Sequence, residues 1–187
     1  MDAVMLVFVG GFLTLLVCWG RRRFAAFPAQ TPGDYDDIGP EFDIRTHLSG
    51  PLQCEGVIYG PFGRVTSRFT VDMDGTWDGD TGTLAETFRY DDGSVQKRAW
   101  HLTVGEDGHF TALADDVNGA GRGRQMGPTV QLLYQIRLAE DAGGHVLRVV
   151  DWMYLVGEKT IINRSQFRKF GIKVAELVAT IRPKDMS

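Results

Sequence analysis

The sequence predicts an all-β protein: a single antiparallel up-and-down barrel of about eight to nine strands, preceded by an N-terminal transmembrane helix. The chain of 187 residues begins with one long apolar run, and most of the remainder alternates between apolar and polar residues. Asp-Gly and Gly-Gly pairs separate the alternating stretches, which is typical of β-hairpins. With 23 Gly but only 7 Pro, the composition favours many tight turns over a low-complexity chain.

The composition argues against several classes of function. The 20 Lys and Arg against 24 Asp and Glu give a formal net charge of −4, which suits nucleic-acid phosphates poorly. The two cysteines are too few for a disulfide framework or a zinc cage, and the four histidines show no metal-ligand spacing. No nucleophile elbow is present. We therefore expect no nucleic-acid partner, no metal and no cofactor, and we assign no catalytic residue.

Residues 3–19 form a near-continuous apolar run that is followed at once by Arg21-Arg22-Arg23. As a helix this run spans roughly 25 Å, slightly less than the ~30 Å hydrocarbon core of a bilayer. Snorkelling arginines and slight thinning of the bilayer can close such a gap. We therefore expect residues 1–27 to be an uncleaved membrane anchor that contacts lipid through residues 3–19.

Two alternatives to an anchor are a secretory or lipoprotein signal peptide and a buried helix of the domain. A signal peptide carries positive charge before its apolar run, whereas Asp2 stands there in this chain. Lipoprotein processing needs a small residue just before the modified cysteine, but Cys18 follows Leu16-Val17. Because the basic residues follow the apolar run, the positive-inside rule predicts that the downstream domain lies in the cytoplasm. An exported or lipid-anchored domain on the periplasmic side is the alternative location.

Residues 28–41 contain three of the seven prolines together with glycines and acids, so we expect a linker there. The domain that follows, residues 42–184, is expected to form the barrel, because closing the sheet removes its exposed edges. An eight-stranded barrel leaves room for side chains or one small ligand. The alternation predicts strands, besides a first strand near residues 50–56, at 65–73, 84–90, 98–104, 110–114, 130–138, 146–156, 160–167 and 172–181.

Two stretches of this domain allow other interpretations. Lys173 and Glu176 would also suit a short helix in the last segment. The glycines from Gly119 to Gly127 resemble a phosphate-binding loop, but such a loop needs a helix after it, and Pro128 and an alternating stretch follow instead. We expect a long glycine-rich hairpin connection there.

Polar residues on the apolar face of a strand are the candidates for a site. Glu86 and Arg98 both lie on apolar faces, and a three-residue connection at Asp91-Asp92-Gly93 pairs Glu86 directly with Arg98 and Leu84 with Trp100. We expect a charge-assisted pair inside the barrel, either as a structural pair or as the anchor for a polar head group.

Aromatic and polar residues of three later strands complete the candidate ligand-binding set. We expect Trp152 and Tyr154 to point inward, with Asp151 outward or at a rim, because such side chains both fill barrels and line ligand cavities. Asn163 and Arg164 suit the end of a strand near the barrel mouth. The full candidate set is Glu86, Arg98, Trp100, Tyr134, Trp152, Tyr154, Asn163 and Arg164.

Several motifs resemble one family, the bacterial domain of unknown function 3833. They are Pro40-Glu41-Phe42, Gly50 with Gly56, Leu84-x-Glu86-x-Phe88-x-Tyr90-x-Asp92-Gly93, Arg98-x-Trp100, Asp116-Val117-x-Gly119, Asp151-Trp152-Met153-Tyr154, and Asn163-Arg164-Ser165 running to Lys169-Phe170-Gly171. The resemblance spans residues 42–182 and implies a lipocalin-like barrel of unknown activity, often carried by envelope lipoproteins. It places the predicted anchor in a bacterial inner membrane, crossed once.

Three functions fit these expectations. The first is a membrane-anchored protein that binds a hydrophobic or acyl-chain ligand, either a small molecule or a lipid, in the barrel. The second is a structural or partner-docking envelope protein whose barrel interior is filled. The third is a lipid-modifying enzyme that uses the same cavity, although the absence of a catalytic constellation favours a protein that is not an enzyme. Fold alone does not choose between them.

Overall fold

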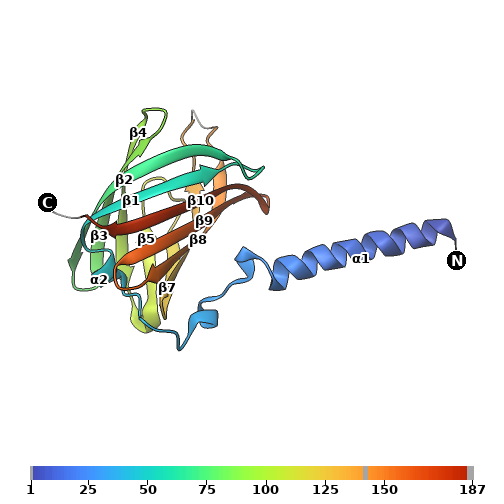
Figure 1. Ribbon diagram of the computed structural model, residues 1–187, viewed down its shortest axis with the longest axis horizontal. Helices are drawn as coiled ribbons and strands as arrows, with labels where there is room; N and C mark the ends of the chain where they lie inside the picture. Colours follow the sequence, from blue (N-terminus) through green and yellow to red (C-terminus); the bar gives the residue numbers. More distant parts are fainter. Residues whose placement is uncertain (1, 141–142, 185–187) are drawn as a thin grey trace.

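A closed antiparallel β-barrel with an N-terminal helix beside it makes up the chain in the computed structural model (Figure 1), which describes residues 2–140 and 143–184. The elements outside the barrel wall are α1 (Ala3–Phe24), η1 (Phe27–Ala29), η2 (Pro32–Tyr35), α2 (Ile44–His47) and η3 (Glu106–Gly108). The strands are β1 (Gly50–Tyr59), β2 (Val65–Asp78), β3 (Thr81–Tyr90), β4 (Val95–Val104), β5 (His109–Leu113), β6 (Gly121–Met126), β7 (Thr129–Arg137), β8 (Val146–Val156), β9 (Thr160–Lys169) and β10 (Ile172–Pro183).

Each strand pairs with its neighbours in sequence, and β1 pairs with β10 to close the barrel. The predicted fold class is therefore confirmed, with ten strands in the described part of the chain rather than eight or nine. The segment that also allowed a helix belongs to strand β10.

The additional strand is β6, in the stretch that we expected to be a hairpin connection. Its glycines are a consequence of packing. A Cβ added to Gly123 would lie 2.0 Å from the Phe110 ring, so the ring of the neighbouring strand occupies the space of a side chain. The expectation of one long connection was wrong because Gly121 and Gly123 lie within a strand, where the lack of a side chain makes room for neighbouring residues, whereas Gly119 and Gly127 do lie in the turns on either side of it.

Helix α2 closes one end of the barrel. Phe42, Ile44 and Leu48 are buried and join the apolar core, and Asp43 caps the helix by accepting a hydrogen bond from the Arg45 backbone N–H. The other end, where β1 meets β2 and β9 meets β10, is called the rim here. Between the core and the rim lie half-buried apolar side chains, among them Phe88 and Phe167.

Helix α1 extends away from the barrel, on the side to which the β1–β2 and β9–β10 hairpins point (Figure 1). Residues Ala3–Arg21 are apolar and long enough to span a membrane, and no part of this segment is buried in the protein. These properties are compatible with a single membrane span or with a signal sequence.

The segment between α1 and the barrel packs along the outer wall. The ring of Tyr35 contacts Trp152 and Tyr154, with centroid distances of 5.4 and 6.0 Å. The Gln30 side chain accepts hydrogen bonds from both tyrosine hydroxyls, at 2.5 Å from Tyr35 and 2.9 Å from Tyr154. Although its composition is that of a linker, this segment covers part of β8.

Candidate functional site

The predicted register of β3 and β4 is confirmed. Glu86 lies opposite Arg98, and Leu84 lies opposite Trp100. The expected ion pair between them is replaced by another one. Among the described residues, the guanidinium of Arg98 pairs instead with Asp116, with 3.2 Å between Nε and Oδ1, and its carbon Cζ lies 4.0 Å from the centre of the Trp100 ring.

Asp116 reaches Arg98 because the β5–β6 connection is held against β7. The Arg137 backbone N–H donates to the Asp116 carbonyl at 2.7 Å, and Val117 forms a bridge with Ile136. This connection places the Asp116 carboxylate inside the rim end of the barrel, where it competes with Glu86 for the guanidinium of Arg98. The register of the β3–β4 hairpin contains no information about the β5–β6 connection, which lies outside that hairpin.

Glu86 is thereby left with a buried carboxylate oxygen, Oε2, that has no hydrogen-bond partner among the residues that the structure describes. Burial raises the pKa of Glu86 to about 7; Arg98 opposes this rise, and the carboxylates of Asp151 and Asp116 add to it. A buried polar atom without a partner is costly, so each one requires an explanation, for example a bound molecule that satisfies it. Raised carboxyl pKa values also cluster at functional sites.

Asp151 is the second interior carboxyl. We expected it to face outward or to lie at a rim, and this expectation was wrong. Asp151 points into the barrel, where its Oδ1 accepts hydrogen bonds from Asn163 Nδ2 at 2.5 Å and Ser165 Oγ at 2.8 Å. Burial raises the pKa of Asp151, although both hydrogen bonds and the charge of Arg98 act in the opposite direction. Of the predicted pair Asn163 and Arg164, only Asn163 faces the interior.

A cavity of about 80 Å³ lies between these groups and the α2 end. Its polar lining comes from Glu86, Asp151 and Asn163, whereas Arg98 does not line it. The apolar residues that line it are Ile44, Leu48, Met73, Leu84, Trp100, Leu102, Phe110, Leu132, Met153 and Ile181.

Two other buried groups adjoin the polar cluster. Tyr134 packs edge-on against Trp100 with a centroid distance of 5.2 Å, and burial raises the pKa of its hydroxyl. Burial likewise raises the pKa of the Cys54 thiol to about 12, which keeps this cysteine in its unreactive protonated form. Within residues 2–140 and 143–184, no group of three or more His, Cys, Asp or Glu side chains is arranged to hold a metal ion.

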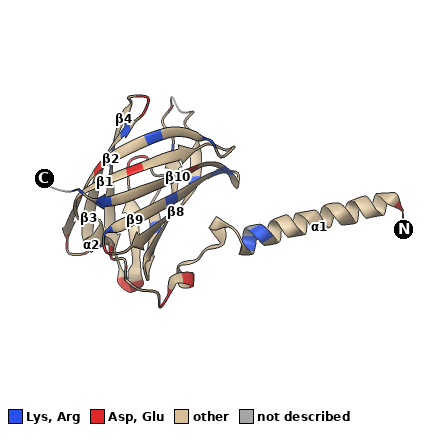
Figure 2. Cartoon of the chain, viewed as in Figure 1, with Lys and Arg blue, Asp and Glu red and all other residues tan. Residues whose placement is uncertain are grey.

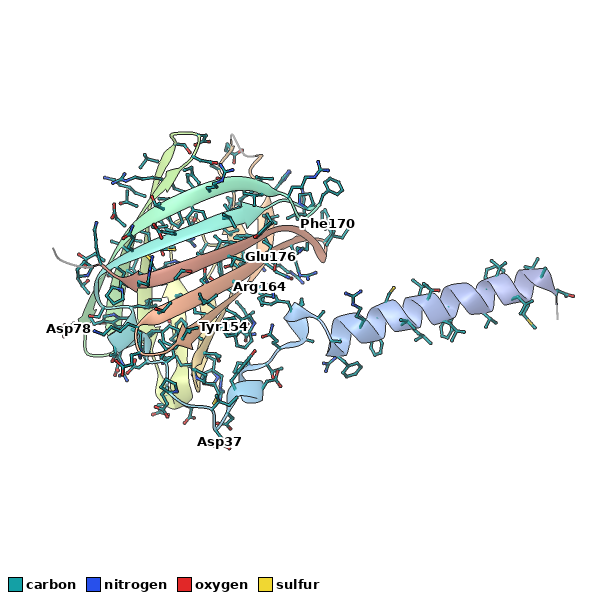
Figure 3. All side chains as sticks on the ribbon, viewed as in Figure 1. Asp37, Asp78, Tyr154, Arg164, Phe170 and Glu176 are labelled. Atoms are coloured by element: carbon teal, nitrogen blue, oxygen red, sulfur yellow. The ribbon has the colours of Figure 1, made fainter. Side chains whose placement is uncertain are left out.

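Trp152, Tyr154 and Arg164 lie on the outer wall, contrary to the expectation for the two aromatic residues. Tyr154 and Arg164 are labelled in Figure 3. Trp152 is fully buried because Tyr35 covers it from outside the barrel. Arg164 donates from Nε to Glu176 at 2.6 Å, and its Cζ lies 4.5 Å from the centre of the Phe27 ring. These three residues fasten the N-terminal segment to the barrel.

The interior residues that the sequence analysis missed are Asp116, Asp151 and Ser165. The alternation of β8 carried no decisive signal for Asp151. Both faces of this strand are largely apolar and each carries one charged residue, Arg148 on the face of Trp152 and Asp151 on the other. Asp116 lies outside the strands, so the alternation carried no signal for it.

The fold and this site define a lipocalin-like barrel with a small, acidic internal cavity. The profile of the family described as "Protein of unknown function (DUF3833)" matches residues 23–183, so the chain belongs to this family, and the resemblance drawn from its motifs is confirmed. None of the curated proteins matches the chain in sequence.

A solved structure supports the fold assignment. The S-type phycobiliprotein lyase CPES from Guillardia theta superimposes with a TM-score of 0.57 over 76% of this chain and 90% of that chain, at 11% sequence identity. At this identity the likeness establishes a shared barrel fold and does not extend to an activity.

Proposed function

We propose that the protein is a membrane-anchored binding protein that holds a small amphiphilic molecule inside its barrel. The observation that carries this proposal is the buried, unpartnered Oε2 of Glu86 beside a cavity whose other polar lining is Asp151 and Asn163. Nε and Nη2 of Arg98 and both carboxylate oxygens of Asp116 are also buried without a hydrogen-bond partner among the described residues, and of these atoms Oε2 of Glu86 is the one that belongs to a residue lining the cavity.

The charges of the cavity select the polar group of the ligand. Glu86 and Asp151 both present carboxyl oxygens, and the guanidinium of Arg98 lies outside the lining and is paired with Asp116. A hydroxyl or an amine can donate hydrogen bonds to these oxygens, whereas a carboxylate would meet like charge. The ligand class is therefore an apolar chain or ring that ends in a hydrogen-bond donor, such as a long-chain alcohol.

The apolar part of the ligand needs more room than the cavity of about 80 Å³ offers. Ligand pockets usually measure about 300–1,000 Å³. Met73 and Met153 line the cavity, and methionine side chains are unbranched and repack readily. Their movement towards the half-buried aromatic residues near the rim would lengthen the cavity.

The small cavity also favours a second candidate, a structural envelope protein whose barrel interior is filled. In that case Glu86 is a tolerated defect of the core, and no ligand copurifies.

Native mass spectrometry and solvent extraction of the purified full chain test for a bound molecule. Competition against a fluorescent lipid probe then compares an alcohol, an amine and a carboxylic acid of equal chain length at pH 8. We expect the acid to bind most weakly. Leu84→Phe fills the cavity and should abolish binding, whereas Leu133→Phe, on the exposed outer face of β7, is the matched control.

Three results would contradict the proposal. Tightest binding of the acid would overturn the assignment of the polar group. Equal binding by Leu84→Phe and Leu133→Phe would place the ligand outside the barrel. No extracted molecule and no competition by any of the three probes would favour the filled structural barrel.

A further inference from the structure

Two neighbouring hairpins at the rim carry exposed aromatic side chains. Strands β1 and β10 are paired, so the β1–β2 and β9–β10 connections lie side by side. Phe62 in the first connection is 92% exposed, Phe170 in the second is 93% exposed, and Ile172 beside it is 70% exposed. Figure 3 places Phe170 at the tip of its hairpin, on the side of the barrel towards α1.

The backbone at Phe170 is strained. Phe170 has φ = +50° and Gly171 has φ = +79°, so both residues of this two-residue turn are in the left-handed region. Turns of this kind strongly prefer Asn-Gly, because a bulky residue is disfavoured at positive φ. An exposed phenylalanine at this position therefore destabilises the turn. Residues that conflict with their local backbone conformation are expected at functional positions.

The two tips themselves carry basic residues and no acidic ones. Residues 60–64 and 169–172 contain no Asp or Glu, and they include Arg64 and Lys169, whereas Lys173 beyond the second tip is paired with Glu176. Figure 2 shows Lys and Arg at this end of the barrel and at the end of α1 nearest to it. Aromatic residues flanked by basic residues are typical of surfaces that contact the head groups of anionic lipids.

The attachment of α1 keeps these tips close to the membrane. Phe27, which packs under Arg164 of β9, follows Arg23 in the last turn of α1 by four positions in the chain. An extended chain of that length reaches about 14 Å at most. Since Tyr35 then fastens the following residues to β8, the wall of β9 stays near the end of the helix.

We propose that Phe62 and Phe170 insert into the head-group region of the bilayer that α1 crosses, while Arg64 and Lys169 contact anionic lipid head groups. The rim of the barrel then faces the membrane, so an amphiphilic ligand passes between bilayer and barrel without crossing water. This inference rests on the anchoring role of α1 proposed above.

The test uses the full chain in nanodiscs that hold a single copy, made from phosphatidylglycerol and phosphatidylcholine or from phosphatidylcholine alone. Cys18→Ser removes the exposed thiol, and Cys54 is buried. A nitroxide is attached at Ile172→Cys, or as a matched control at Val156→Cys, an exposed apolar position at the α2 end. Collisions with oxygen report a lipid environment, and collisions with a water-soluble nickel chelate report water.

In anionic discs we expect the label at 172 to be protected from nickel and the label at 156 to be accessible. Arg64→Glu should weaken this contact by about fivefold for each unit of charge changed, and phosphatidylcholine alone should weaken it as well. Phe170→Asn should abolish the protection at 172 and at the same time raise the urea midpoint of the barrel, because asparagine suits the turn. A merely structural Phe170 would instead lower that midpoint when replaced.

The anchoring of the chain by α1 and the docking of the two hairpins on the membrane fail in different ways. If the chain elutes with the discs but both labels are equally accessible to nickel, docking of the hairpins is overturned and the anchor stands. If the chain does not elute with the discs, the anchor and the docking are overturned together. Protection at 172 that persists in Phe170→Asn would also refute the role of this side chain.

Discussion

Replacing Glu86 by glutamine should change how the stability of the barrel depends on pH. The carboxyl has an ordinary pKa of 4.5 in the unfolded chain and a pKa of about 7 in the folded protein, because burial disfavours its charged form. Between these values the folded state keeps a proton that the unfolded state has lost. The free energy of unfolding therefore falls as pH rises through this window, and the proton's contribution is complete only below pH 4.5.

The size of the effect follows from the same two pKa values. Each unit of pKa difference is worth about 1.4 kcal/mol, so wild type should lose up to about 3 kcal/mol of unfolding free energy between pH 4.5 and pH 8 through this group. Glu86→Gln has no proton to lose there. Asp151, whose pKa is also raised, contributes a loss of the same sign to both proteins, so the difference between them reports the titration of Glu86 together with its coupling to Asp151.

Urea unfolding of the full chain in detergent, followed by tryptophan fluorescence from pH 5 to pH 9, measures this difference by linear extrapolation. Glu158→Gln, which removes an exposed carboxyl in the β8–β9 turn, should retain the wild-type profile. If the unfolding free energies of wild type and Glu86→Gln run parallel across this range, Glu86 is not buried as described and the argument for an internal site fails.

Two further substitutions test the packing that shapes the barrel. Gly123→Ala should destabilise the barrel by about 1–3 kcal/mol, because the added methyl group meets the Phe110 ring. Combining Gly123→Ala with Phe110→Leu should restore part of this loss. An unchanged urea midpoint for the single variant would contradict the packing of β6. Tyr35→Ala should speed amide hydrogen exchange in residues 27–38 while the barrel strands stay protected, because Trp152 loses the ring that covers it; unchanged exchange would show that other contacts hold this segment.

The β3–β4 hairpin shows what local patterns are able to predict. Its register depends on the length of one turn and on the rule that both apolar faces share one side of the sheet, and both are visible within 20 residues. Strand β8 shows the opposite case. Both of its faces are covered, one by the core and the other by the N-terminal segment, so alternation does not distinguish Asp151 from Trp152 as the inward residue.

The sequence by itself determined the class of fold, the apolar leader, the family and the facing of Glu86 and Arg98, because periodicity, turn residues and motifs act over short stretches of chain. Only the tertiary structure decided that Asp116 takes the guanidinium, that Asp151 joins Glu86, and that the space between them is small. These contacts depend on closure of the barrel, which brings together side chains from strands and connections far apart in the chain, and no local pattern records those distances.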